Sequence, residues 1–197
     1  MGKIKHLDRI EEFIDKTKAF SVKDIKRFLI SNRANPNYAY TILHILKKKG
    51  KIYRIVKGYY SKYDDPMVIT YCIKPSYIGL ENALSLHGLW EQETNVILIT
   101  PRRLRFGIRK VLGANVVIHH ISKEHFFGYE YMDYYDLKIP VSDTEKTFID
   151  WIYYYDEIDK DLLELFDKKI NRKRLKEYLK NYDNRFAKKV QDILSRR

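Results

Sequence analysis

Apolar residues recur at helical spacing three times within the first 50 residues, and this pattern predicts three short helices. The first helix is expected over residues 3–16 and the second over about 22–30. Ser21 is the expected N-cap of the second helix, because Asp24 stands at its third position. Short helices in this order are typical of a helix-turn-helix.

The third helix is expected to begin at Asn35, with Pro36 in its first turn, and to end at Gly50. Its predicted buried face follows the spacing i, i+3, i+4 and i+7: Ala39, Ile42, Leu43 and Leu46. The opposite face carries amide, hydroxyl and cationic side chains, namely Asn37, Tyr40, Thr41, His44 and Lys48, and Tyr38 lies near its boundary. Such groups hydrogen-bond base edges and phosphates, so this face is a candidate for contact with nucleic acid.

Two short strands are expected next, in KIYRIV (51–56) and GYYSKY (58–63), joined by a tight turn at Lys57–Gly58. Three helices followed by a basic two-stranded ribbon are the order of a winged helix-turn-helix. In that arrangement the third helix enters the major groove and the wing lies near the backbone. We therefore predict that residues 1–63 form a winged helix-turn-helix DNA-binding domain.

A domain boundary is expected at Tyr63–Pro66, where turn-forming residues precede a change in composition, so that residues 66–197 form the second domain. The apolar, β-branched runs TNVILIT and NVVIHHI predict strands, and FFGYEYMDYYDLKIPV predicts further strands with a turn. SYIGLENALSLHGL predicts a helix that closes at Gly88.

Helices are expected over the remainder of the second domain. One begins at Ser142, since Ser142-Asp143-Thr144-Glu145 has the capping-box pattern. The tail from Asp159 onward is helical in pattern, with Asn171 and Asn184 as caps or interruptions. The expected fold class is therefore α+β: a winged helix-turn-helix followed by an α/β domain with a mixed sheet and C-terminal helices.

Charge is distributed unevenly along the chain, whose formal net charge is +12. Residues 1–65 contain 16 Lys and Arg against 7 Asp and Glu, a charge of +9, whereas residues 66–150 contain 9 against 10. Basicity concentrated in one third of the chain indicates a module that binds a polyanion. A Lys-rich proteome from a hot environment would also raise the basic content, but it does not explain the asymmetry.

Several classes of protein are disfavoured by composition. No run of about 18 apolar residues is present to span a membrane, and MGKIKHLDRIEEF has no apolar signal-peptide core. Cys72 is the single cysteine, which excludes an internal disulfide. We expect a cytoplasmic protein without a membrane partner.

Enzymatic and metal-binding motifs are also lacking. His119, His120 and His125 raise the question of a metal site, but His119 and His120 are adjacent on a predicted strand and point to opposite faces, so they do not readily share one ion. Cysteine ligands and carboxylates at a recognised spacing are also lacking. Glu145-Lys146 lacks the carboxylate spacing of a metal-dependent nuclease, and Glu145 is interpreted as part of a helix cap. We expect no catalytic residue, no metal and no cofactor.

The predicted contacts with double-stranded DNA fall into two groups. Base or groove-edge contacts are expected from Asn37, Tyr38, Tyr40, Thr41 and His44. Phosphate contacts are expected from Lys47, Lys48, Lys51, Arg54, Lys57 and Lys62. The lysines at the helix end have an alternative role as solvated partners of the helix dipole. A second basic cluster, Arg102, Arg103 and Arg105, has three interpretations: contact with a partner protein, contact with DNA, or solvent exposure.

The chain resembles the AbiEi-type antitoxins, regulators of abortive-infection and toxin–antitoxin systems. In the first domain the resemblance rests on YTILHILKKKGKIYRIVKGYY. In the second it rests on YIGLENALSLHGLWEQ, TPRR, FFG and IPVSDTEKTFIDWI, the last containing a glutamate–lysine signature at Glu145-Lys146 followed by Asp150. The resemblance implies a winged-helix repressor of its own promoter, with an α/β antitoxin-like domain that counteracts a nucleotidyltransferase-like toxin encoded beside it.

Other functions stay open at this point. The second domain is alternatively a protein-interaction module that inhibits a partner, or the chain is a plain winged-helix regulator without a toxin. A nucleic-acid-processing enzyme is a third class, for which the sequence offers no carboxylate or histidine cluster. A homodimer on DNA would place its half-sites about 34 Å or a multiple apart, and nothing in the sequence decides whether it forms.

Overall fold

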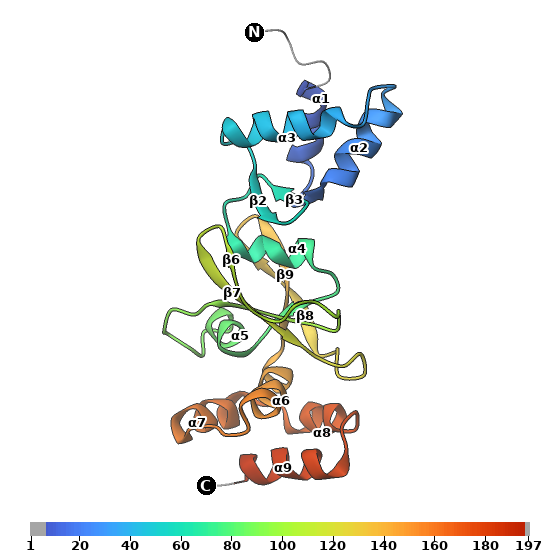
Figure 1. Cartoon of the computed structure of the whole chain (residues 1–197). Helices are drawn as coiled ribbons and strands as arrows, with labels where there is room; N and C mark the ends of the chain where they lie inside the picture. The colour runs from blue at the N-terminus through green and yellow to red at the C-terminus, as the bar shows by residue number, and fades with distance from the viewer. Residues whose placement is uncertain (1–6, 196–197) are drawn as a thin grey trace. The chain divides into compact units, whose positions relative to one another are not determined.

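The computed structural model describes residues 7–195, which divide into two compact units (Figure 1). The first unit runs to Lys74 and includes Lys110–Ala114, and the second comprises Pro75–Arg109 and the chain from Asn115 onward. The division at Lys74 lies beyond the boundary expected at residues 63–66, because the short helix α4 (Ile69–Cys72) packs against β2 (Tyr53–Val56).

The first unit has the three helices and two strands in the order that the sequence predicts, with the short strand β1, a 3₁₀ turn and the short helix α4 in addition. They are α1 (Leu7–Asp15), β1 (Phe20–Ser21), α2 (Val22–Ser31), α3 (Tyr38–Lys48), β2, β3 (Tyr59–Ser61), a 3₁₀ turn (Pro66–Val68) and α4. The expected start of the first helix at residue 3 lies outside the described residues.

The caps of α2 and α3 show where local sequence decides structure. Ser21 Oγ accepts from the Asp24 N–H, and an Asp24 carboxylate oxygen accepts from the Ser21 N–H at 2.7 Å, so the predicted cap of α2 is confirmed. The prediction that α3 begins at Asn35 is wrong. Asn35 Oδ1 instead accepts from the Asn37 N–H at 2.9 Å in a tight turn, which delays the helix to Tyr38.

The end of α3 is fixed by Gly50, as predicted. Gly50 has φ +68°, a conformation that glycine adopts without a Cβ penalty. Its N–H donates to the Lys47 carbonyl and the Lys51 N–H donates to the Leu46 carbonyl, both at 3.0 Å. This pair of bonds is the Schellman arrangement, and it turns the chain sharply from α3 toward β2.

A three-stranded antiparallel sheet closes the first unit, with strand order β1-β3-β2. Phe20 lies opposite Tyr60, and Tyr53 opposite Ser61. Two residues, Lys57 and Gly58, connect β2 to β3 as expected. Aliphatic side chains that are at most 1% exposed form its helical core: Ile10, Ile25, Leu29, Ala39, Ile42, Leu46 and Ile52.

The second unit contains most of a six-stranded mixed sheet, whose order is β6-β7-β5-β4-β9-β8. The strands are β4 (Tyr77–Ile78), β5 (Val96–Thr100), β6 (Gly107–Val111), β7 (Ala114–His120), β8 (Tyr129–Tyr134) and β9 (Leu137–Ser142). β4 pairs parallel with β9 and β5 parallel with β7, whereas β4–β5 and β8–β9 are antiparallel. The predicted α+β class with a mixed sheet is thus confirmed.

Five helices accompany this sheet in the described part of the second unit. They are α5 (Leu80–Leu86), α6 (Thr144–Tyr155), α7 (Lys160–Lys169), α8 (Arg172–Leu179) and α9 (Asn184–Leu194). The last four follow one another at the C-terminal end, and both α7 and α8 pack against α6 (Figure 1). The predicted C-terminal helices are therefore confirmed.

The caps of these helices differ from the prediction in two places. The capping box at Ser142 is wrong, because Ser142 is the last residue of β9 and Asp143 caps α6 instead. Asn171 caps α8 as expected, accepting from the Lys173 and Arg174 N–H groups, but Asp183 rather than Asn184 caps α9. Among residues 7–195 no helix is both long and apolar enough to cross a membrane.

Candidate nucleic-acid interface

Helix α3 exposes most of the side chains that the sequence assigns to base contact. Asn37, Tyr40, Thr41 and His44 are exposed, whereas Tyr38 is half-buried and packs against the helical core. Local sequence explains this division, because the four apolar residues of the opposite face are at most 2% exposed. The N-terminal half of α3 thus presents an amide, a hydroxyl, an imidazole and a phenol to solvent.

Helix α2 adds a cation to this surface that the sequence analysis did not single out. The Lys26 ammonium lies 4.6 Å from the centre of the Tyr40 ring, and Tyr40 is 57% exposed. A cation over an aromatic face is held by the ring quadrupole. The contact places a positive charge beside the exposed face of α3. Its only sequence signal was the position of Lys26 next to Ile25 on the polar side of α2.

The ribbon of β2 and β3 carries two exposed cations. Arg54 and Lys57 are exposed, and neither forms an ion pair with any residue that the structure describes. Lys57 stands in the connection between the strands, where Gly58 has φ +83°. Their charges are therefore available to an anionic ligand without first breaking an ion pair.

Two other predicted phosphate contacts are already paired with α1. Lys51 Nζ lies 2.5 Å from Glu11 Oε2, and Lys62 Nζ lies 3.2 Å from Asp15 Oδ1. Lys62 also donates to the Asp15 backbone carbonyl at 2.9 Å. Partly exposed pairs of this kind contribute about 0–1 kcal/mol, so they tie the ribbon to α1 weakly. Contact of either lysine with a phosphate would compete with this pairing.

The three lysines at the end of α3 are all exposed. Lys47 and Lys48 lie in its last turn and Lys49 is its C-cap. This position suits both interpretations made from the sequence, because lysines there complement the carbonyl end of the helix dipole and also extend the basic surface.

The second basic cluster lies in the other unit, on the connection from β5 to β6. Arg102, Arg103 and Arg105 are exposed there, and the Arg102 N–H donates to Thr100 Oγ1 at 3.2 Å. The Arg105 carbonyl accepts from Arg109 Nη2 at 2.5 Å. The structure thus places these arginines on a surface loop, and their three interpretations stay predictions.

The three histidines are separated by their aromatic neighbours. His119 lies 4.7 Å from the ring of Tyr154, His120 lies 5.2 Å from Phe106, and His125 stacks on Tyr182 at 3.9 Å. Burial lowers the pKa of His119 and of His125. No group of three metal-binding side chains occurs in the described part of the chain.

Glu145, Lys146 and Asp150, the residues of the glutamate–lysine signature, are all buried. Lys146 and Asp150 are both 0% exposed and form an ion pair one turn apart on α6. Tyr77 donates to the other Asp150 oxygen at 2.8 Å, and Lys146 donates to the Tyr182 hydroxyl at 3.2 Å. We call Lys146, Asp150, Tyr77 and Tyr182 the buried lysine centre.

Burial acts on the two charges of this centre in opposite senses. It lowers the pKa of Lys146 and raises the pKa of Asp150, because both charged forms lose water. The mutual attraction of the pair and the Tyr77 hydroxyl oppose these shifts. Phe127 completes the enclosure, with its ring centre 5.2 Å from the Lys146 ammonium. Both charged side chains are thus enclosed by residues from β4, from α6 and from the segments before β8 and after α8.

Close packing at Gly128 brings the FFG motif to the same centre. A Cβ on Gly128 would lie 2.8 Å from Lys146 Cβ and 2.9 Å from Tyr178 Cε2, and its φ is +69°. Both constraints require glycine. The FFG motif therefore packs directly on the helix that carries the glutamate–lysine signature.

Glu145 does not cap its own helix, and that interpretation is wrong. Its Oε1 accepts from the Asn171 N–H at 2.6 Å, and Arg174 lies 3.6 Å from its other oxygen. Asp143, the actual cap, accepts from the Tyr178 hydroxyl at 2.6 Å. The start of α6 is thus bonded to α8, a connection between segments too far apart in sequence for local patterns to reveal.

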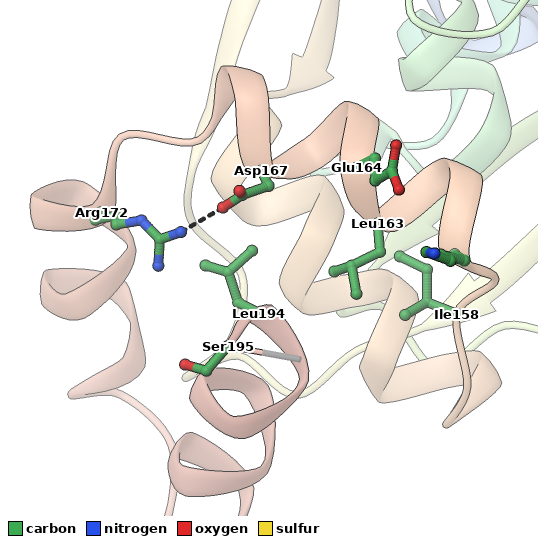
Figure 2. A pocket seen from close by; sticks show the side chains of 8 residues that line it. Ile158, Leu163, Glu164, Asp167, Arg172, Leu194 and Ser195 are labelled. Carbon is green, nitrogen blue, oxygen red and sulfur yellow. Dashed lines mark hydrogen bonds and ion pairs between the residues drawn. The ribbon is translucent and has the colours of Figure 1, made fainter. Parts of the chain in front are cut away.

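A cavity of about 980 Å³ lies among the C-terminal helices (Figure 2). Its apolar wall includes Ile158, Leu163 and Leu194, and Asp167 forms an ion pair with Arg172 at one side. The remaining lining residues, Lys160, Glu164 and Ser195, are charged or polar, so the wall of this cavity is mixed in character.

Replacing Lys146 with methionine should destabilise the protein strongly, because Asp150 would remain buried without its cation. We expect the free energy of unfolding to fall by about 3–5 kcal/mol. Urea unfolding followed by tryptophan fluorescence reports on this unit, since Trp90 and Trp151 both lie in it. The double variant Lys146→Met/Asp150→Leu should recover much of the loss.

A matched control for that experiment is Lys180→Met, because Lys180 pairs with Glu177 at 2.6 Å on the exposed surface. Its effect should stay within about 0.5 kcal/mol. Equal effects of Lys146→Met and Lys180→Met would show that the buried lysine centre does not hold the unit together.

The fold of this chain is similar to that of a solved protein structure. No family model matches the chain, and no curated protein matches it. Among solved structures, the chain is similar to the crystal structure of the RV2827C protein from Mycobacterium tuberculosis, with a TM-score of 0.63 and 13% sequence identity. The match covers 98% of this chain and 77% of that chain. At this identity the likeness shows a shared fold alone.

Proposed function

We propose that the first unit is a winged helix-turn-helix that binds double-stranded DNA. In this proposal the N-terminal half of α3 enters the major groove and the β2–β3 ribbon is the wing. The observation that carries it is the solvent-exposed polar face of α3, with Asn37, Thr41 and His44. The same unit exposes Arg54 and Lys57, which form no ion pair within residues 7–195. The order of helices and strands supports the same assignment.

Electrostatics favours a polyanionic ligand for this unit. The first 65 residues carry a formal charge of +9, and several exposed cations among them form no ion pair with a described residue. A field of this sign raises the rate of association with DNA and supplies sequence-independent affinity. It supplies no preference between sequences, which must come from α3.

Within this proposal, one group of side chains contacts bases and another contacts phosphates. Asn37 and Thr41 are one helical turn apart, so both can face the same groove. An amide makes two hydrogen bonds to adenine and a threonine methyl packs on thymine. Lys47, Lys48, Arg54 and Lys57 bind phosphates and fix the register of the helix.

We further propose that the chain is a transcriptional repressor that acts as the antitoxin of a toxin–antitoxin pair. The support is the resemblance to AbiEi-type antitoxins and the position of its motifs, since FFG and the glutamate–lysine signature pack together in the second unit. This unit would antagonise the toxin, while the first binds the promoter. A plain regulator without a toxin would use the first unit in the same way.

DNA affinity should fall steeply with salt. Four phosphate contacts predict a decrease in log K of about 3–4 per decade of salt concentration, at about 0.9 per contact. Lys57→Gln should reduce the slope by about 0.9 and weaken binding to all sequences alike. Titrations at several salt concentrations measure this. Lys168→Gln is the matched control, an exposed lysine of the second unit, and should leave the slope unchanged.

Substitution at Asn37 or Thr41 should change sequence preference rather than the salt slope. We expect Asn37→Ala to reduce discrimination at one base pair by about 1–3 kcal/mol. Selection from a pool of random duplexes, carried out with the parent and the variant, measures this preference. The exposed Ser31, at the end of α2, provides the control Ser31→Ala. An unchanged preference in the Asn37 and Thr41 variants would exclude α3 as the reading element.

Antitoxin activity should survive loss of DNA binding. The product of the adjacent gene should arrest growth when it is expressed alone, and co-expression of this chain should restore growth. The variant Arg54→Gln/Lys57→Gln should restore it equally, because the proposed toxin contact lies in the second unit. If the product of the adjacent gene does not arrest growth, the antitoxin role is excluded for this pair, and the alternative of a plain regulator without a toxin is favoured. Loss of rescue in the double variant would assign the activity to DNA binding.

A further inference from the structure

The second unit contains a smaller cavity that the proposed DNA-binding surface does not use. Its volume is about 240 Å³, and it lies between α5, the segment before β5, the strands β5 and β7, and the end of α6. This is below the roughly 300–1,000 Å³ of typical small-molecule sites, and it suits the end of one long side chain.

One wall of the cavity is aromatic. Trp90 and Tyr155 line it, and Trp151 lies between them with ring centres 6.1 Å from Trp90 and 4.9 Å from Tyr155. Trp151 is only 8% exposed and its indole N–H donates to the Glu157 carbonyl at 3.2 Å. The buried ring therefore supports two partly exposed rings whose faces can receive a cation.

Two carboxylates line the same cavity. Glu81 Oε2 accepts from the Tyr155 hydroxyl at 3.1 Å, and Glu93 lies on the segment before β5. None of the described residues that line the cavity is a lysine or arginine, and neither carboxylate forms an ion pair with a described residue. In a chain of net charge +12, this cavity is a local negative site without an internal cation.

A buried acceptor without a donor lies next to this cavity. Asn82 is 6% exposed, and its amide nitrogen donates at 3.3 Å to Oγ1 of Thr94, a residue that lines the cavity. The amide oxygen of Asn82 has no hydrogen-bond partner among the described residues. Buried polar atoms rarely lack a hydrogen-bond partner, because the loss of hydration costs free energy.

We propose that this cavity binds the guanidinium group of an arginine side chain presented by a partner protein. A guanidinium has five N–H donors in a plane, so it can stack on Trp90 or Tyr155 while it donates to Glu81. An ammonium stacks less well and has fewer fixed donors. A phosphate is excluded by the two carboxylates, so this site is independent of DNA binding by the first unit.

The test is titration of the full chain with N-acetyl-L-arginine N-methylamide, followed by two-dimensional amide NMR. The indole N–H signal of Trp90 and the backbone signals of the cavity segment should shift together and saturate. The citrulline analogue, which has the same shape without the charge, should bind at least about tenfold more weakly, as expected for loss of a charge-assisted hydrogen bond.

Matched variants locate the contact. Glu81→Gln keeps the size of the side chain and should weaken binding by about tenfold, whereas Glu91→Gln, an exposed neighbour outside the cavity, should stay within about twofold. Trp90→Leu keeps an apolar side chain but removes the ring face, and should also weaken binding. Thermal unfolding of each variant verifies the fold.

Three results would overturn the proposal. They are equal affinity for the arginine and citrulline probes, equal affinity for N-acetyl-L-lysine N-methylamide, and equal effects of Glu81→Gln and Glu91→Gln. The failure of DNA binding in the first unit would affect none of these measurements, because the probe carries no phosphate and the cavity lies within the second unit.

Discussion

The second unit depends on one interaction, the ion pair between Lys146 and Asp150, both of which are fully buried. Removing two charges from water costs several kcal/mol for each ion, and only close pairing with further hydrogen bonds offsets that cost. Tyr77 on β4 and Tyr182 after α8 supply those bonds, so the pair is satisfied only when the sheet and the C-terminal helices meet around α6. An apolar core would contribute comparable stability, but it would not require these partners to be in place.

In the first unit, by contrast, the described charged side chains lie on the surface and not in the core. Its core is aliphatic, and its cations lie on the surface of α3 and the ribbon. Lys51 and Lys62 are bound by carboxylates of α1, while Arg54 and Lys57 are not paired with described residues. Cations that form no ion pair with a described residue therefore lie both at the end of α3 and on the ribbon.

Sequence reasoning succeeded where the deciding contacts are local. The Ser21–Asp24 cap, the Gly50 helix end and the turn at Lys57–Gly58 each depend on residues a few positions apart. It failed where the partner is distant. Neither the burial of Lys146 nor the bond from Asn171 to Glu145, 26 residues apart, is visible in periodicity, because a lysine or glutamate on a helix is usually exposed. The sharing of a cavity by Glu81, Trp90 and Tyr155 likewise follows only from tertiary structure.

The first unit exposes cations and the second has carboxylates in a small cavity, so the two units are suited to ligands of opposite charge. Free cations on an exposed face attract any polyanion, and selectivity then requires hydrogen bonds from α3. Carboxylates in a small cavity attract cations, and the aromatic residues Trp90 and Tyr155 in its lining favour a cation that is flat enough to stack. Because lysines and arginines outnumber carboxylates by 38 to 26 in this chain, a cavity carboxylate without an internal cation is the exception. In the proposal that a partner arginine enters this cavity, the guanidinium supplies the cation that the described lining residues lack.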